Sequence, residues 1–338
     1  MVQGVINMLT AIMPSRGDVF NTVLFLKCYE KHWKESVDKL IIHINSPVEK
    51  RVVDFMTDYI GQHDKTEVMY TPNYVDHGGS LTQMVKTIDE GDVLFLEEDT
   101  LILNKDFIPA KYDRMLNNNC DAIGTVRGCC SQEIIDRQKT LYNCSGLNLA
   151  PYFTFCKVSD LRKTDLVFVA KSYPQGSTIE PINLSCNANM AGDTFVWMSI
   201  QLRALGLRIL ENNEIDGGTV DYQNFQTRTG IFAPNCHRIH HHTLYMDYLI
   251  TDDGLVFTSK ERSPTKRVWV PNLSDSVNQM QIHAWAKLAL ELTRDEIVGI
   301  DNFVEEYEHL ANRDIQLNNL DMNFINKLKE CYKVKVGL

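Results

Sequence analysis

The sequence predicts an α/β fold, with a mostly parallel central sheet flanked by helices and a helical appendage at the carboxyl end. Between Leu9 and Tyr70, short apolar runs typical of buried strands alternate with segments of helical periodicity. Strands that alternate with helices in this way form parallel sheets joined by right-handed crossovers. After Pro271 the apolar residues follow helical spacing only, which predicts the appendage.

The first half supplies four predicted strands and three predicted helices in alternation. The strands are predicted at 9–13, 40–44, 67–70 and 93–96. The first helix follows Asp18 as a plausible N-cap, the second covers 52–59, and the third begins just after Gly78 and Gly79. This part, about 1–105, is expected to form the first half of the main domain.

The second half is less regular. A helix is predicted at 106–116 and a strand at 121–126, and 151–158 is rich in strand-forming residues. The polar region 127–148 resembles an active-site flap or acceptor loop, although a plain surface loop explains it equally well. Residues 172–192 are predicted as a loop, and Asp193 as the cap of a helix that Gly206 ends, before a strand at 207–210.

The domain boundary is placed near residue 270. The main domain is predicted to cover 1–270, with 106–270 as its second half, and the helical appendage to cover 271–338. In the appendage Thr293 and Glu296 have the spacing of a capping box. No pattern in the sequence indicates an oligomeric state.

Composition indicates an ordinary globular protein with reduced thiols. Of 338 residues, 44% are hydrophobic and 23% charged, and no window approaches the ~18 apolar residues of a membrane span. The net charge of −10 argues against a surface that binds polyanions as a whole. The nine cysteines are irregularly spaced without a CxxC pair, and no signal peptide is recognisable. We therefore expect a cytoplasmic protein, or one of the host cytoplasm if viral.

Three acids follow the fourth predicted strand in the stretch GDVLFLEEDTLIL, which begins at Gly91. Glu97, Glu98 and Asp99 would lie at the carboxyl end of that strand, where open α/β sheets bind ligands. Carboxylates so close together repel each other unless water or a cation separates them. Taken alone, the stretch favours a solvated acidic turn over a metal site.

Four features in fixed order resemble the GT-A fold glycosyltransferases, most closely the family 2 type. They are a strand end at Pro14-Ser15-Arg16, a second at Asn45-Ser46-Pro47, the Gly78-Gly79 helix leading into GDVLFLEED, and AGDTFVWMSIQLRALGLRIL at 191–210. The resemblance covers about residues 7–210. It implies a Rossmann-like GT-A domain that uses Mn²⁺ or Mg²⁺ and a nucleotide-sugar donor, most often a UDP-sugar. In such a domain, about 1–105 would be the nucleotide-sugar half and about 106–270 the acceptor half.

The resemblance also implies donor-side roles for particular residues. Asp99 takes the last position of the metal-binding acidic motif, Glu97 the ribose or metal-water contact, and Glu98 belongs to the same turn but points away from the cation. The family usually has two aspartates where this chain has Glu97 and Asp99, and the longer Glu97 side chain is expected to accept a ribose hydroxyl or a water. Asn45 replaces an acid that touches the base, and an amide can still recognise uracil. The remaining donor contacts implied are Pro14, Ser15, Arg16, Gly78 and Gly79.

On the acceptor side, Asp193 matches the general base of inverting members, against the plainer role of a helix cap. Four histidines lie at 237 and 240–242. His237 or one of His240 to His242 loosely matches a downstream histidine that some members use as a metal ligand, and we take His237 and His240 as the candidates. A solvated loop is the alternative.

These residues predict an enzyme that moves a sugar from a nucleotide to a hydroxyl group, with inversion. The acceptor is expected to be a glycan or, less favoured, hydroxymethylated phage-type DNA, since Lys260, Arg262, Lys266 and Arg267 could form a phosphate-binding patch. A nucleotidyltransferase is the alternative enzyme, but PSRGD is too short for its usual Gly-rich, basic signature. A non-catalytic nucleotide- or glycan-binding relative is the third possibility, and intact Asp99 and Asp193 argue against it.

Overall fold

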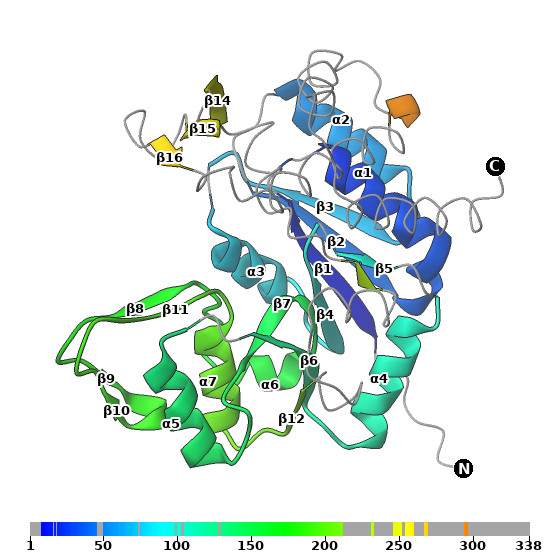
Figure 1. The fold of residues 1–338 in the computed structure, drawn as a ribbon. Coiled ribbons are helices and arrows are strands. Elements are labelled where there is room, and N and C mark those ends of the chain that lie inside the picture. The colour runs from blue at the N-terminus through cyan, green and yellow to red at the C-terminus, as the bar shows by residue number, and fades with distance from the viewer. Residues whose placement is uncertain are drawn as a thin grey trace, which may run out of the picture.

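The computed structural model describes residues 8–211 almost continuously, and five short stretches after them (Figure 1). The exceptions within 8–211 are Arg16, Asp18, 46–49, Tyr74, Asp99, 103–104 and 128–129. The later stretches are 231–232, 246–251, 254–259, 267–269 and 294–296. Predictions for Arg16, Asp18, Asp99, His237, His240 and most of the 271–338 appendage therefore lie outside the described residues.

A seven-stranded sheet forms the centre of the molecule, in the order β12-β6-β7-β4-β1-β2-β3. β7 is antiparallel to β4 and β6, whereas the other neighbouring strands are parallel. The predicted, mostly parallel α/β class is thus confirmed, and the first four strands differ from their predicted bounds by at most two residues. The strands are β1 Leu9–Ser15, β2 Lys39–Ile44, β3 Thr66–Tyr70, β4 Asp92–Leu96, β6 Ala122–Arg127, β7 Asn148–Lys157 and β12 Ile209–Glu211.

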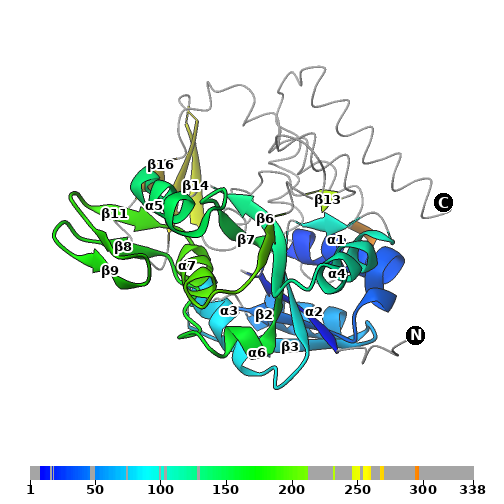
Figure 2. The same cartoon turned by 90° about the horizontal axis from the view of Figure 1, so that it is seen from below.

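Helices cover both faces of this sheet (Figures 1 and 2). Successive strand residues point to opposite faces, so Leu94 and Leu96 of β4 join one apolar cluster while Val93 and Phe95 join the other. The first cluster is closed by α1 Val19–Cys28, α2 Lys50–Gly61 and α4 Phe107–Asn117. The second is closed by α3 His77–Lys86, α6 Val158–Leu161 and α7 Val196–Ala204. Short π and 3₁₀ turns, Tyr29–Trp33 and Lys34–Ser36, connect α1 to β2.

A third apolar cluster lies to one side of the sheet. Two of the segments around it were expected as loops, and both contain regular secondary structure. The region 127–148, expected as a loop, contains α5 Gln132–Tyr142. The region 172–192, also expected as a loop, contains two antiparallel pairs and a 3₁₀ turn, and α7 packs against this side cluster as well (Figure 1). These elements are β8 Lys171–Tyr173 with β11 Met190–Gly192, β9 Thr178–Ile179 with β10 Leu184–Ser185, and the turn Glu180–Ile182.

The described stretches after residue 211 are short. β13 Ile231–Phe232 pairs with β5 Leu101–Ile102, and β14 Met246–Thr251, β15 Gly254–Ser259 and β16 Arg267–Trp269 form an antiparallel sheet. In the 3₁₀ turn Arg294–Glu296, the Glu296 carboxylate accepts from Lys27 of α1 and from Tyr59 of α2. Glu296, predicted for a capping box, therefore makes a tertiary contact with the main domain. None of the described helices has the length and apolar character needed to cross a membrane.

Candidate active site

The acidic turn after β4 lies at the carboxyl edge of the sheet, as predicted. β4 is fully buried, and the turn is closed by a hydrogen bond from the Thr100 amide to the Glu97 carbonyl at 2.9 Å. Glu98 and Thr100 are 5% and 1% exposed, so these two side chains are not solvated as the composition of the turn alone favours. Asp99, the predicted metal ligand, lies outside the described residues. Among the residues described, no group of three or more His, Cys, Asp or Glu could hold a metal ion.

Helix α3 begins beside this acidic turn. His77 is its first residue, and the His77 Nε2 lies 3.7 Å from the Glu97 Oε1. The helix therefore starts one residue before the glycines, not after them as predicted. The reason is Asp76, whose side chain caps the helix by accepting a hydrogen bond from the Gly79 amide at 2.7 Å. Sequence reasoning passed over His77, although it stands next to the glycine pair.

Gly78 has a packing role that the sequence did not reveal. A Cβ atom at this position would lie 2.4 Å from the Val169 Cα and 2.5 Å from the Val169 backbone nitrogen. Only glycine allows the first turn of α3 to approach the segment 168–169 so closely. The predicted contacts of Gly78 and Gly79 with a donor remain predictions.

The ends of β1 and β2 form the floor of the site, and the predicted residues there lie together. Pro14 and Ser15 are buried in β1 and pair with His43 and Ile44 of β2. The Ser15 hydroxyl accepts from the Gly17 amide at 3.0 Å and lies 3.1 Å from the Thr22 hydroxyl oxygen. Ser15 is therefore engaged within the protein.

Asn45 follows β2 and is held on three sides. Its backbone amide donates to the Ser15 carbonyl at 3.0 Å, and its backbone carbonyl accepts from the Val75 amide at 3.1 Å. Its side-chain Nδ2 donates to the Val75 carbonyl at 3.1 Å. Its Oδ1 is buried and has no hydrogen-bond partner among the described residues. This is unusual, because a buried acceptor in a folded protein usually has a hydrogen-bond partner.

His43, which sequence reasoning missed, connects the floor to α3. Its side chain is buried, with Nδ1 2.8 Å from the Ser80 hydroxyl and Nε2 2.8 Å from the Thr71 hydroxyl. The Thr71 hydroxyl in turn donates to the Gln83 Oε1 at 3.3 Å, which favours an imidazole protonated on Nε2. Burial lowers the pKa of His43 to about 4, so the ring is neutral near pH 7.

We expect His43 to make the protein acid-sensitive. The folded state keeps the ring neutral down to a pKa of about 4, whereas the unfolded chain takes up a proton below its ordinary value of 6.5. The free energy of unfolding should therefore fall between pH 6.5 and pH 4, by about 3 kcal/mol from this group. Urea denaturation at pH 7 and pH 4, compared between wild type and His43→Gln, isolates this contribution from that of the carboxylates. Equal losses in both proteins would contradict the prediction.

Asp193 lies on the surface between β11 and α7. It is exposed, and its Oδ1 accepts a hydrogen bond from the Thr194 amide at 2.8 Å. The N-cap position of α7 belongs to Phe195, and no side chain caps this helix. The prediction that Asp193 caps the helix is therefore wrong, and its carboxylate is left facing solvent.

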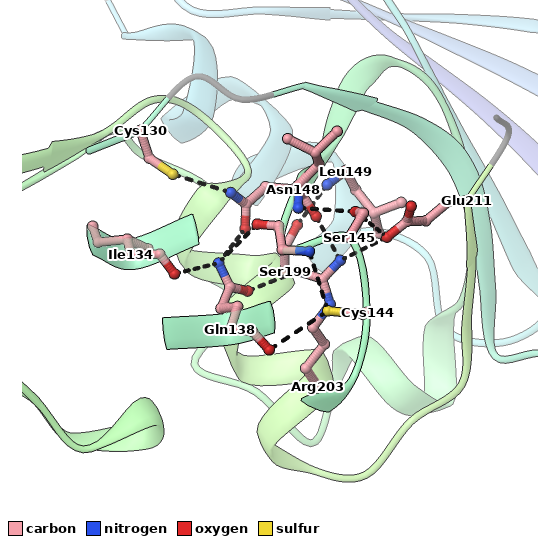
Figure 3. A network of polar contacts seen from close by, with 12 residues as sticks. Cys130, Ile134, Gln138, Cys144, Ser145, Asn148, Leu149, Ser199, Arg203 and Glu211 are labelled. Carbon is pink, nitrogen blue, oxygen red and sulfur yellow. Dashed lines mark hydrogen bonds and ion pairs between the residues drawn. The ribbon is translucent and has the colours of Figure 1, made fainter. Parts of the chain in front are cut away.

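A buried polar network holds the other end of α7 (Figure 3). Arg203 donates to the Gln138 Oε1 at 2.7 Å and to the Leu147 carbonyl at 2.5 Å, and it pairs with Glu211 at 3.6 Å. Gln138 donates onward to the Asn148 Oδ1 at 3.1 Å. The network thereby joins α7 to α5, β7 and β12, and none of its members stands out in the sequence.

The network continues to the strand before Asp193. The Asn148 Nδ2 donates to the Cys130 Sγ at 3.3 Å, and Cys130 forms an isolated antiparallel bridge with Gly192. The Ser199 hydroxyl of α7 accepts from the Leu149 amide at 2.9 Å. Cys130 is one of six described cysteines, and no disulfide joins any two of these six.

Together these features define an α/β, Rossmann-like protein whose candidate site lies at the carboxyl edge of a mostly parallel sheet. No family model and no curated protein matches the chain. Among solved structures, the fold is similar to a mannosyltransferase from Pyrobaculum calidifontis in complex with GDP-Man and Mn²⁺, at 9% identity and a TM-score of 0.40. That match covers 61% of this chain and 54% of the other, so this chain spans about half the length of the mannosyltransferase.

Two further solved structures are similar at the same level. Glucosyl-3-phosphoglycerate synthase from Mycobacterium tuberculosis, in complex with Mn²⁺, UDP and glucosyl-3-phosphoglycerate, matches at 13% identity and a TM-score of 0.34, covering 46% of this chain and 58% of that one. A 4-diphosphocytidyl-2C-methyl-D-erythritol synthase from Anaerococcus prevotii matches at 15% identity and a TM-score of 0.31. That match covers 45% of this chain and 71% of the synthase. At these identities the function has to be inferred from the residues of the chain itself.

Proposed function

We propose that this protein is a metal-dependent glycosyltransferase of the GT-A type, which moves a sugar from a nucleotide-sugar donor to a hydroxyl acceptor. The observation that carries the proposal is the contact between two aromatic rings. Phe95 and Phe195 meet edge to face, with ring centroids 4.8 Å apart. Phe95 lies two residues before Glu97, and Phe195 two residues after Asp193. The contact brings the strand with the acidic turn next to the loop with the exposed aspartate.

The donor side of the proposal rests on the floor of the site and on the acidic turn. The buried Asn45 Oδ1 is suited to accept a hydrogen bond from an N–H group of a base such as uracil, and a UDP-sugar is therefore the donor we favour. The amino end of α3 beside Glu97 provides the partial positive charge that favours a diphosphate. Arg16, which follows the buried Pro14 and Ser15 at the end of β1, completes the proposed nucleotide contacts.

The acidic turn also has the chemistry that a hard divalent cation requires. Glu97 and Glu98 directly precede Asp99 in the sequence, and carboxylate oxygens are the ligands that Mg²⁺ and Mn²⁺ prefer. We propose Asp99 as the principal ligand and His237 or His240 as a further ligand, with Glu97 as the contact to the ribose or to metal-bound water. When bound, such a cation neutralises the charge that develops on a leaving nucleoside diphosphate.

Asp193 is proposed as the general base. Its carboxylate faces solvent, and the hydrogen bond from the Thr194 amide to Oδ1 leaves further acceptor positions for an acceptor hydroxyl. As the sugar acceptor attacks, its hydroxyl proton would move to the Asp193 carboxylate. Attack from the side opposite the leaving diphosphate would invert the configuration of the sugar. A glycan is the favoured acceptor, and hydroxymethylated DNA is the less favoured one.

A thermal-shift screen of nucleotide sugars with and without Mn²⁺ tests this function. A donor at 100 times its dissociation constant should stabilise the protein by about 2.7 kcal/mol, and we expect a UDP-sugar to do so only when Mn²⁺ is present. Glu97→Gln should weaken the Mn²⁺-dependent part of the shift. Glu90→Gln is the matched control, because Glu90 is exposed at the opposite end of β4. If no nucleotide sugar shifts the melting temperature under either condition, the proposed function is wrong.

A further inference from the structure

Phe195 has an unusual backbone conformation for its residue type and surroundings. Its φ is +76°, in the left-handed region, although the side chain is large and 0% exposed. Residues other than glycine rarely adopt this conformation, and a bulky buried residue does so only where its surroundings impose it. Such residues occur most often at functional sites.

This conformation decides where α7 begins. The Phe195 carbonyl accepts the first hydrogen bond of the helix, from the Ser199 amide at 2.9 Å, while its own amide donates to the Phe168 carbonyl at 3.0 Å. The Asp193 carbonyl accepts from the Val196 amide at 3.1 Å. The chain thus makes a tight turn just before the helix, and the Asp193 carboxylate stays outside the cap position.

Aromatic contacts hold Phe195 in place. Its ring lies 4.8 Å from that of Phe95 on β4 and 5.1 Å from that of Phe168, and the latter two rings are 5.4 Å apart. Aromatic pairs at these separations stabilise beyond the area that they bury. The three rings therefore supply an energy that offsets the backbone strain.

Phe168 extends the contact to α3. The Thr82 hydroxyl of α3 donates to the Leu166 carbonyl at 2.9 Å, and Gly78 packs against the backbone of Phe168 and Val169. The segment around Phe168 consequently touches both the helix that begins beside the acidic turn and the turn that carries Asp193. A change at Phe195 can thus alter the position of Asp193 relative to the donor side.

We propose that Phe195 is a positioning residue, whose left-handed backbone, held by Phe95 and Phe168, keeps the Asp193 carboxylate outside α7 and turned toward the acceptor side. The inference rests on the proposed function, because it presupposes that Asp193 acts on an acceptor. It assigns Phe195 no contact with substrate.

Two isomeric substitutions isolate the backbone effect. Phe195→Leu and Phe195→Ile remove the same ring and add side chains of equal volume, but the β-branched isoleucine tolerates a positive φ far less well. We expect both variants to keep the Mn²⁺-dependent thermal shift and the KM for the donor. Their kcat values should differ by about tenfold, with Phe195→Ile the slower, as ~1.4 kcal/mol of extra strain would produce. Equal kcat values would overturn the inference and leave the proposed function intact.

A second measurement does not depend on transfer. With ¹⁵N-threonine labelling, the Thr194 amide resonance reports the ionisation of the Asp193 carboxyl group, to which it donates. This response should be retained in Phe195→Leu and lost in Phe195→Ile. If the wild type transfers no sugar but the amide responses differ in this way, the proposed function fails while the positioning by Phe195 stands. Retention of the response in both variants would overturn the positioning.

Discussion

Replacing Asp193 by asparagine is expected to lower the rate of sugar transfer by about 10²–10⁴-fold, the usual contribution of a general base. The amide can still accept the hydrogen bond from the Thr194 amide, so the local turn should persist. It cannot take the proton of an acceptor hydroxyl at neutral pH, because an amide is not basic. The loss should therefore appear in kcat, while the KM for the donor and the donor-dependent thermal shift stay near those of the wild type.

Because Asp193 is not the N-cap of α7, a catalytic role can be distinguished from a structural one by measuring stability. An N-cap aspartate stabilises a helix by about 1 kcal/mol, but the N-cap of α7 is Phe195 and has no side-chain cap. The melting temperature of Asp193→Asn should therefore be close to that of the wild type. Asp136→Asn, which removes an exposed carboxylate from α5, serves as the control and should keep full activity. Full transfer by Asp193→Asn would show that another group accepts the proton.

The sheet could be predicted because each of its first strands has a recognisable local sequence pattern. The apolar runs at 40–44 and 93–96 have the length and composition of strands buried on both faces, and helical periods separate them. Once strand and helix alternate, crossover handedness leaves few arrangements of the elements. The carboxyl edge, where Asn45 and Glu97 lie, follows from that topology without knowledge of any tertiary contact.

Helix α5 could not be predicted because its buried side does not consist of apolar residues alone. Ile134, Ile135 and Gln138 are the buried residues of the helix, and Gln138 is satisfied by partners that lie far away in the sequence. The periodicity of apolar residues does not reveal that a glutamine is buried. The polar stretch was therefore interpreted as a loop.

The start of α7 and the role of His43 escaped prediction for a related reason. Local rules favour aspartate as a helix cap, and only the packing of Phe195 against Phe95 and Phe168, distant in sequence, imposes the left-handed turn that displaces it. His43 lies in an apolar strand, and its two partners, Thr71 and Ser80, come from later elements. Such roles become visible only when the fold brings the partners together.

Replacing Arg203 by methionine is expected to lower the free energy of unfolding by about 3–5 kcal/mol, because it leaves a buried charge without its partner. Arg203 and Glu211 are each 6% exposed, and they lie 3.6 Å apart. Methionine fills similar space but provides none of the hydrogen bonds to Gln138 and Leu147. Among the described residues, the Glu211 carboxylate would keep the hydrogen bond from the Ser145 hydroxyl (Figure 3).

The double variant Arg203→Met/Glu211→Gln shows whether the unpaired charge is the cause. Neutralising Glu211 should restore part of the stability, because an amide is much less costly to bury than a carboxylate. Arg208→Met, which changes an exposed arginine one turn beyond α7, should alter the free energy by no more than about 0.5 kcal/mol. Urea denaturation of the four proteins measures these differences. If the double variant is no more stable than Arg203→Met, then the lost hydrogen bonds, and not the unpaired charge, cause the fall in the free energy of unfolding.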